Sequence, residues 1–250
     1  MLTTPESIRT LQRKLYRKAK QEPACRFHAL YDKIYRADTL SHAYALVRAN
    51  KGSAGIDGIT FEGIEAKEGA AVFVTGLAEA LRSKRYKPDP VKRVMIPKAD
   101  GSQRPLGIPT IRDRVAQMAV KLVIEPIFEA DFCDTSYGFR PKRSAHDAIG
   151  DVAHSLNKGY SEVIDADLAK YFDSIPHAKL MVMVAERISD GAILRLIRMW
   201  LKAPIMEVDA DGTKRNIGGG KRNRKGTPQG GVMTPRTQKI TWHIPTYRWS

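Results

Sequence analysis

Two hairpin patterns set within a mainly helical chain constrain the fold most. The first has β-prone runs at 91–97 and 104–109 on either side of a turn at 98–102. The second is expected over 204–218, with its turn at 209–212. Strands and helices do not alternate as they do in βαβ units. The sequence therefore predicts an α+β fold, in which an antiparallel sheet carries helices on one face.

Apolar residues at three- and four-residue steps predict the helices. The first 50 residues favour two or three helices, and the first of these is basic and amphipathic. That basic helix is either a solvated surface or a phosphate-contacting arm. Further helices are expected within 64–81, over 111–126, after Ser144, after Pro176 and over 192–201, and a strand is expected at 161–167.

The charge balance indicates a polyanionic partner. The chain has 42 Lys and Arg against 27 Asp and Glu, a formal charge of +15, so nucleic acid is the leading candidate. Cys25 and Cys133 form neither a CxxC pair nor a Cys/His cluster, which argues against a disulfide framework or a zinc site and favours a cytoplasmic protein. Apolar runs fall far short of the roughly 20 residues of a membrane span, so no membrane partner is expected.

The segment 163–175 contains the most informative acidic residues. If 161–167 is a strand, Asp165 and Asp167 share a face at its end, where carboxylates can hold Mg²⁺. By themselves, Asp165, Asp167 and Asp173 would be interpreted as strand-end, helix-cap and surface acids. Asp167, Phe172 and Asp173 form the pattern Asp-x-x-x-x-Phe-Asp. This pattern resembles the first palm motif of reverse transcriptases, specifically that of bacterial group II intron reverse transcriptases, also called maturases.

The resemblance implies specific roles for this segment. Asp167 would be the catalytic residue and a metal ligand, the Leu168 carbonyl a second ligand, and Phe172 a gate against the wrong sugar. The implied cofactor is Mg²⁺, with two ions about 3.5–4 Å apart acting on the oxygens of an in-line attack by a primer 3′-hydroxyl. Direct roles for Asp165 and Asp173 stay open.

The first hairpin resembles the fingers hairpin of the same family. Its strands contain Ile-Pro-Lys, ending at Lys98, and Arg-Pro-Leu-Gly-Ile-Pro, starting at Arg104. In relatives the matching pair grips the triphosphate of the incoming nucleotide, and an ammonium with a guanidinium suits phosphate oxygens. Without the resemblance, both residues would be interpreted as solvated surface charges.

Three further segments match the family. Thr-Ile-Arg-Asp-Arg at 110–114 is one, and the others contain candidate ligand-binding residues. In Ser-Tyr-Gly-Phe-Arg-Pro, Tyr137, Phe139 and Arg140 could contact template RNA, with core packing and one surface arginine as the alternative. In Lys-Gly-Thr-Pro-Gln-Gly-Gly, Gln229 would contact the nucleotide. The preceding basic arm supplies the RNA-binding candidates Lys221, Arg222, Arg224 and Lys225.

The match ends near residue 235. The family continues into a Tyr/Phe-x-Asp-Asp hairpin, which this sequence does not contain, and 236–250 reads as unrelated to the family. We therefore interpret the chain as an N-terminal fragment, truncated before that motif. Its expected parts are a basic helical extension (1–50), fingers with the start of the palm (51–160), a partial palm (161–235) and an aberrant tail (236–250).

The resemblance implies an RNA-directed DNA polymerase, a nucleotidyltransferase. Its partners would be template or intron RNA, a DNA primer and deoxynucleoside triphosphates, and the parent protein would bind intron RNA as a maturase. Because the second set of catalytic carboxylates is absent from the sequence, this chain alone is expected to polymerise little or nothing. The alternatives are a non-catalytic RNA-binding module and a degraded gene product. The sequence does not predict the oligomeric state.

Overall fold

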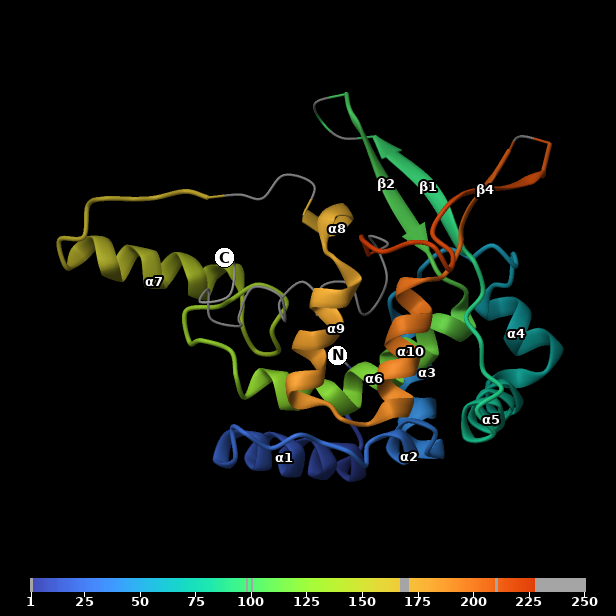
Figure 1. The fold of residues 1–250 in the computed structure, drawn as a ribbon, viewed down its shortest axis with the longest axis horizontal. Helices are drawn as coiled ribbons and strands as arrows, with labels where there is room; N and C mark the ends of the chain where they lie inside the picture. Colours follow the sequence, from blue (N-terminus) through green and yellow to red (C-terminus); the bar gives the residue numbers. More distant parts are fainter. Residues whose placement is uncertain (1, 98, 100, 167–170, 210, 228–250) are drawn as a thin grey trace.

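The computed structural model describes residues 2–97, 99, 101–166, 171–209 and 211–227 as helices around a central helix, with two β-hairpins projecting from one end (Figure 1). The helices are α1 (Glu6–Gln21), α2 (Tyr31–Ile34), α3 (Ala37–Ala49), α4 (Phe61–Lys67), α5 (Gly69–Arg82), α6 (Ile111–Glu129), α7 (Ala145–Asn157), α8 (Tyr171–Ser174), α9 (His177–Arg187) and α10 (Gly191–Leu201). The strands are β1 (Val91–Pro97), β2 (Gln103–Ile108), β3 (Ile205–Val208) and β4 (Lys214–Gly218). The predicted α+β class and both hairpins are confirmed.

The sheet is mixed, which corrects the expected antiparallel one. Its order is β2-β1-β3-β4, and each hairpin is antiparallel. The hairpins meet through a parallel pairing of β1 with β3, with Val91 opposite Ile205 and Lys92 opposite Met206. The Val91 N–H also donates to the Pro204 carbonyl oxygen at 2.8 Å. Both hairpins leave the helical body side by side, so their first strands run in the same direction (Figure 1).

Helix α6 is the centre of the hydrophobic core. It packs against α1 and α3, and its apolar side chains are buried around almost the whole helix, as expected for a helix covered on all sides. The core includes side chains from helices between α1 and α10, with none from α7, so it joins residues of the first three predicted parts of the chain. The domain boundaries themselves stay predictions. The first turn of α6 lies directly after β2 and so ties the hairpin to the core.

The expected strand at 161–167 is wrong for 161–166, which form no strand and are exposed; residue 167 lies outside the described residues. Ile164 is 95% exposed. A strand needs a neighbour to satisfy its backbone N–H and C=O groups, and no described strand pairs with this segment. Period-two alternation therefore gives no basis for placing Asp165 on a common face with another acid.

The predicted cap at Ser144 is confirmed. The Asp147 N–H donates to Ser144 Oγ (3.2 Å), and the Ser144 N–H donates to Asp147 Oδ2 (2.7 Å), which together make a capping box. Helix α7 projects away from the other helices and has no buried residue (Figure 1). Within the described residues, no helix is long and apolar enough to cross a membrane.

Candidate functional site

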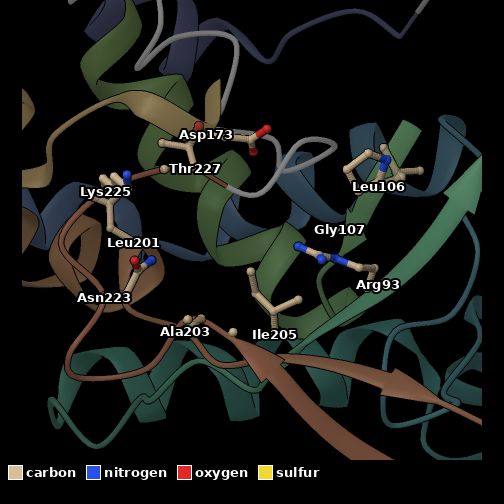
Figure 2. A pocket seen from close by; sticks show the side chains of 14 residues that line it. Arg93, Leu106, Gly107, Asp173, Leu201, Ala203, Ile205, Asn223, Lys225 and Thr227 are labelled. Carbon is tan, nitrogen blue, oxygen red and sulfur yellow. The ribbon is translucent and has the colours of Figure 1, made fainter. Parts of the chain in front are cut away.

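A cavity of about 270 Å³ lies at the base of the β1–β2 hairpin (Figure 2). Its walls come from both hairpins, the end of α10, residue 173 and the segment 218–227. Its polar side chains are those of Arg93, Asp173, Asn223, Lys225 and Thr227. Figure 2 shows the Arg93 side chain reaching from β1 toward the space between these groups. Arg93 is paired across the strands with Gly107, which has no side chain to crowd it.

Hydrogen bonds join two sequence motifs that are more than 50 residues apart. The Thr227 N–H donates to the Phe172 carbonyl oxygen (2.8 Å), and the Gly226 N–H donates to the Ile175 carbonyl oxygen (2.9 Å). His177 adds a third contact, because its N–H donates to the Arg224 carbonyl oxygen at 2.8 Å. The start of the Lys-Gly-Thr-Pro-Gln segment is thus fixed beside Phe172 and Asp173. In the sequence the Asp-x-x-x-x-Phe-Asp motif and the Lys-Gly-Thr-Pro-Gln motif are separate, and the fold places them side by side.

Two glycines let backbones approach closely around the cavity. Gly219 has φ +72°, and a Cβ there would lie 2.3 Å from the Ala203 carbonyl oxygen. Gly226 has φ +86°, and a Cβ there would lie 3.1 Å from the Asp173 carbonyl oxygen. Both positions combine a left-handed backbone with a near contact, so only glycine fits them without strain.

We expect Gly226→Ala to lower the free energy of unfolding by about 1–2 kcal/mol, the usual cost of a left-handed non-glycine residue. Urea denaturation followed by circular dichroism measures this change. Gly76→Ala in α5 is the control, because nothing lies within 4 Å of its added Cβ and alanine is favoured inside a helix. A Gly226→Ala protein as stable as the Gly76→Ala protein would contradict the assigned role of Gly226.

Comparison with known proteins identifies the fold family. Residues 96–244 match the model of the family described as reverse transcriptase (RNA-dependent DNA polymerase). The chain belongs to the reverse transcriptase family. The resemblance found in the motifs is thereby confirmed at the level of the family.

The relatives include group II intron proteins. Protein YkfC of Escherichia coli K12 is 38% identical over 239 residues, which cover 93% of this chain and 60% of YkfC. The group II intron-encoded protein LtrA of Lactococcus lactis is 32% identical over 220 residues, which cover 87% of this chain and 34% of LtrA. The mitochondrial nuclear intron maturase 1 of Arabidopsis thaliana is 30% identical over 127 residues. The chain thus spans 60% of YkfC and about a third of LtrA.

Four residues assigned by the resemblance lie outside the described residues: Lys98, Asp167, Leu168 and Gln229. The roles that the resemblance assigns to these four residues therefore stay predictions. Arg104 lies on β2, opposite Ile96 and toward the exposed end of the hairpin. Phe172 is half-buried in α8, with its ring edge-on to that of Tyr171 at a centroid distance of 6.2 Å.

No metal site is visible in the described part of the chain. Its residues contain no group of three or more His, Cys, Asp or Glu side chains that could hold a metal ion. The two residues that the resemblance assigns to Mg²⁺, Asp167 and Leu168, are not among them. The fit of the chain to Mg²⁺ therefore rests on the chemistry of an aspartate oxygen and a backbone carbonyl, both ordinary ligands of this ion.

The three aromatic and basic candidates at 137–140 differ in their surroundings. Phe139 is 65% exposed, so its ring is free to stack on a base. Tyr137 lies under the Arg143 guanidinium, 5.2 Å from ring centroid to Cζ. Arg140 is only 6% exposed in its side chain, where it binds Glu129 at 2.7 Å and donates to the Cys133 carbonyl oxygen. These contacts bury Arg140, which corrects the alternative of a surface arginine, and RNA binding by all three residues stays a prediction.

The basic arm belongs to the segment 218–227, part of which lines the cavity. Lys221, Arg222, Arg224 and Lys225 are all exposed, and they follow β4 in a loop closed by glycines. Only Lys225 lines the cavity itself. All four side chains are accessible to a ligand, and their contact with RNA stays a prediction.

The segment 110–114 connects the β1–β2 hairpin to the start of α6 through buried hydrogen bonds. Thr110 caps α6 by accepting from the Asp113 N–H (3.2 Å), and Asp113 in turn accepts from Tyr86 Oη (2.6 Å). Arg114 donates to the Ser53 carbonyl oxygen at 2.7 Å, which ties the loop ahead of α4 to the same helix. Burial raises the pKa of Asp113 to about 6, although the hydrogen bond from Tyr86 opposes this shift. This motif is therefore a structural support.

Sequence reasoning missed Arg93, Asn223 and Thr227. Arg93 is two residues from both Val91 and Met95 in β1, a spacing that could have placed all three on one face of the hairpin. Thr227 lies inside a motif that the sequence did recognise. No local pattern distinguishes Asn223, which reaches the cavity only because 218–227 folds back onto α8 and α9.

Proposed function

We propose that this chain forms part of an RNA-directed DNA polymerase of group II intron type. One observation carries the proposal: the base of the β1–β2 hairpin, Asp173 and residues 225–227 line a single cavity, and the Thr227 N–H donates to the Phe172 carbonyl oxygen beside it. In the resemblance these are the segments that handle the triphosphate, the metal and the nucleotide. Family membership supports the reaction class, and the activity of the whole protein remains a proposal because the chain spans only part of its relatives.

Each assigned residue has a task suited to its chemistry. Lys98 and Arg104 would hold the triphosphate, the first as a point charge and the second through its planar fork of N–H donors. Asp167 and the Leu168 carbonyl would hold Mg²⁺, which supplies charge neutralisation at the phosphates when bound. Phe172 would exclude the wrong sugar, and Gln229 would contact the nucleotide.

Nucleotide binding tests this assignment. We expect the full chain to bind a deoxynucleoside triphosphate in the presence of Mg²⁺, and Arg104→Gln to weaken this binding about tenfold, because it removes a charge-assisted hydrogen bond. Equilibrium dialysis measures the affinity. Arg82→Gln is the control. Arg82 is an exposed arginine of α5, and its side chain pairs with Glu79. Equal affinities of the two variants would refute the nucleotide site.

Polymerisation by this chain alone is expected to be absent or weak. The two-metal mechanism needs carboxylates from a second segment, and the sequence has no Tyr/Phe-x-Asp-Asp pattern. Primer extension with Mg²⁺ on an RNA template measures the activity. Robust incorporation that Asp167→Asn abolishes would contradict this expectation.

A second candidate function is RNA binding without catalysis. The observation that favours it is a groove of about 1180 Å³ between α1 and the end of α6. Five basic side chains and one tyrosine line it, together with three glutamates; the basic ones are Arg9, Arg13, Arg17, Lys20 and Lys142. If RNA affinity falls steeply with salt and Arg104→Gln changes nothing, this candidate replaces the enzyme.

A further inference from the structure

Several charged and polar groups of the hairpin-base cavity have no partner. Within the described residues, the side chains of Arg93, Asp173, Asn223 and Lys225 make no hydrogen bond or ion pair. Elsewhere on the surface, many charged side chains are paired, such as Arg48 with Glu65. Unpaired donors and acceptors that converge on one cavity leave it chemically open to a polar ligand.

Thr227 adds a buried group that lacks a partner. The residue is 4% exposed and lines the cavity, yet Thr227 Oγ1 has no hydrogen-bond partner in the described part of the chain. A buried hydroxyl without a partner costs about 1–3 kcal/mol, so native structures rarely keep one without a reason. A ligand oxygen in the cavity would satisfy this hydroxyl.

The charges define the ligand. Arg93 and Lys225 are donors only and match the oxygens of a phosphate, which accepts hydrogen bonds. Asp173 is an acceptor only and would repel a phosphate alone, so it needs a hydroxyl donor beside the anion. A ribose phosphate offers both, because its 2′-hydroxyl donates while the phosphate accepts. Deoxyribose lacks this donor.

The surroundings favour a strand over a free nucleotide. Exposed cations at 221, 222 and 224 lie in the same loop without lining the cavity, so the positive charge extends beyond a single unit. Gly107 lies opposite Arg93 on β2 and adds no side chain to the cavity lining, which leaves room for a sugar–phosphate backbone. Figure 2 shows the Arg93 side chain reaching into the cavity from β1, with Lys225 and Thr227 on the opposite side.

We propose that the hairpin-base cavity is a subsite for one ribose-phosphate unit of an RNA strand. Arg93 holds the phosphate from the β1 side, Lys225 and Thr227 Oγ1 bind oxygens of the same unit from the opposite side, and the Asp173 carboxylate accepts a hydrogen bond from the 2′-hydroxyl. The subsite thereby distinguishes RNA from DNA in the strand that it holds. This inference rests on the proposed nucleic-acid function, but it does not need the nucleotide site to be intact.

The first test is RNA affinity of the full chain at several salt concentrations, without Mg²⁺ or nucleotide. We expect Arg93→Gln to weaken binding of a single-stranded RNA about tenfold and to reduce the salt slope by about 0.7, the value for one phosphate on a single strand. Arg93→Lys keeps the charge and so keeps the slope. Lys67→Gln, at an exposed position on α4 away from the cavity lining, is the control. An unchanged affinity in Arg93→Gln overturns the proposal.

The second test compares RNA with DNA of the same sequence. Asp173→Ala should weaken RNA binding about tenfold relative to DNA, because only RNA has the 2′-hydroxyl that the carboxylate accepts. DNA affinity should stay constant or rise, since a negative charge is removed. Equal changes for the two strands would overturn the role of Asp173 in telling the strands apart.

The third test separates ligand binding from folding. Thr227→Val removes the hydroxyl at nearly constant shape, so it should leave the stability of the free protein unchanged or raised while weakening RNA binding. If the variant instead loses stability and keeps its RNA affinity, the hydroxyl is structural and the subsite is refuted.

Nucleotide binding distinguishes the two sources of a phosphate. If Arg93→Gln weakens binding of a deoxynucleoside triphosphate and leaves RNA binding intact, the cavity takes the free nucleotide and the strand assignment falls. If Arg93→Gln weakens RNA binding while Arg104→Gln changes nothing in nucleotide binding, the subsite stands and the polymerase proposal fails. The two failures are thus observed in different experiments.

Discussion

Replacing Asp190 with alanine should lower the free energy of unfolding by about 3–5 kcal/mol. The Asp190 carboxylate is 93% buried and accepts four backbone N–H groups. Oδ1 accepts from the first turn of α10, at Ala192 (3.0 Å) and Ile193 (3.2 Å). Oδ2 accepts from Leu30 and Tyr31 at the start of α2, both at 2.8 Å. One side chain therefore caps two helices that lie 160 residues apart.

The size of the effect follows from what the substitution leaves behind. Loss of a single helix cap costs about 0.5–2 kcal/mol, and each buried N–H without a partner costs about 1–3 kcal/mol. Water can reach some of the freed groups, which limits the total. The range also assumes that the segment around Leu30 keeps its other contact to this region, where the Asp190 N–H donates to the Phe27 carbonyl oxygen at 3.1 Å.

Urea denaturation of the full chain measures the change. Asp147→Ala is the matched control, since Asp147 belongs to a capping box on the exposed helix α7 and should cost about 1 kcal/mol or less. Asp190→Asn should fall between wild type and Asp190→Ala, because an amide keeps one acceptor oxygen. If Asp190→Ala and Asp147→Ala are equally stable, the two-helix cap does not contribute as the geometry implies.

The local elements could be predicted from the sequence because their signals are local. The sequence patterns typical of turns at 98–102 and 209–212 predicted the two hairpins, and apolar periodicity predicted α6 and α10. The Ser144 cap was likewise visible in the sequence, since its partner Asp147 is three residues away. Motif order was sufficient to recognise the family, although four of the residues it assigned lie outside the described part of the chain.

Contacts between distant segments could not be predicted. The parallel pairing of β1 with β3 depends on how two hairpins leave the core, and no periodicity records it. Buried charges were missed for a related reason. Arg187 resembles a surface residue of α9, yet it binds Asp131 at 3.0 Å and donates to the Ala19 carbonyl oxygen at the end of α1. The strand predicted at 161–166 was wrong, because β-prone residues form a strand only where a neighbouring strand pairs with them.

Asp113 should give the protein an unusual loss of stability between about pH 4 and pH 6. Its carboxylate is almost fully buried and accepts from Tyr86 Oη (2.6 Å) and the Asp89 N–H (2.9 Å). Burial raises its pKa to about 6, above the value of about 3.9 in an unfolded chain. The folded state therefore binds more protons than the unfolded state in this window, so stability falls as pH rises.

The expected loss from this group is about 3 kcal/mol, since two pKa units correspond to roughly 2.7 kcal/mol. Other carboxylates act in the opposite direction, because Asp38 has its pKa lowered by hydrogen bonds from Arg36 and Ser7 despite partial burial. The difference between wild type and Asp113→Asn isolates the effect, since asparagine does not titrate. That difference in unfolding free energy should favour wild type most at pH 4 and shrink by about 3 kcal/mol by pH 7.

Tyr86→Phe provides an independent check on the cause of this pH dependence. The Tyr86 hydroxyl receives the Trp200 indole N–H (2.8 Å) and donates to the carboxylate, which lowers the pKa of Asp113 against the effect of burial. Without this donor the pKa of Asp113 should rise further, and the window of falling stability should move to higher pH. If the difference between wild type and Asp113→Asn is constant from pH 4 to pH 7, Asp113 keeps an ordinary pKa. In that case water reaches the Asp113 carboxylate, and the first turn of α6 is more open to solvent than its contacts indicate.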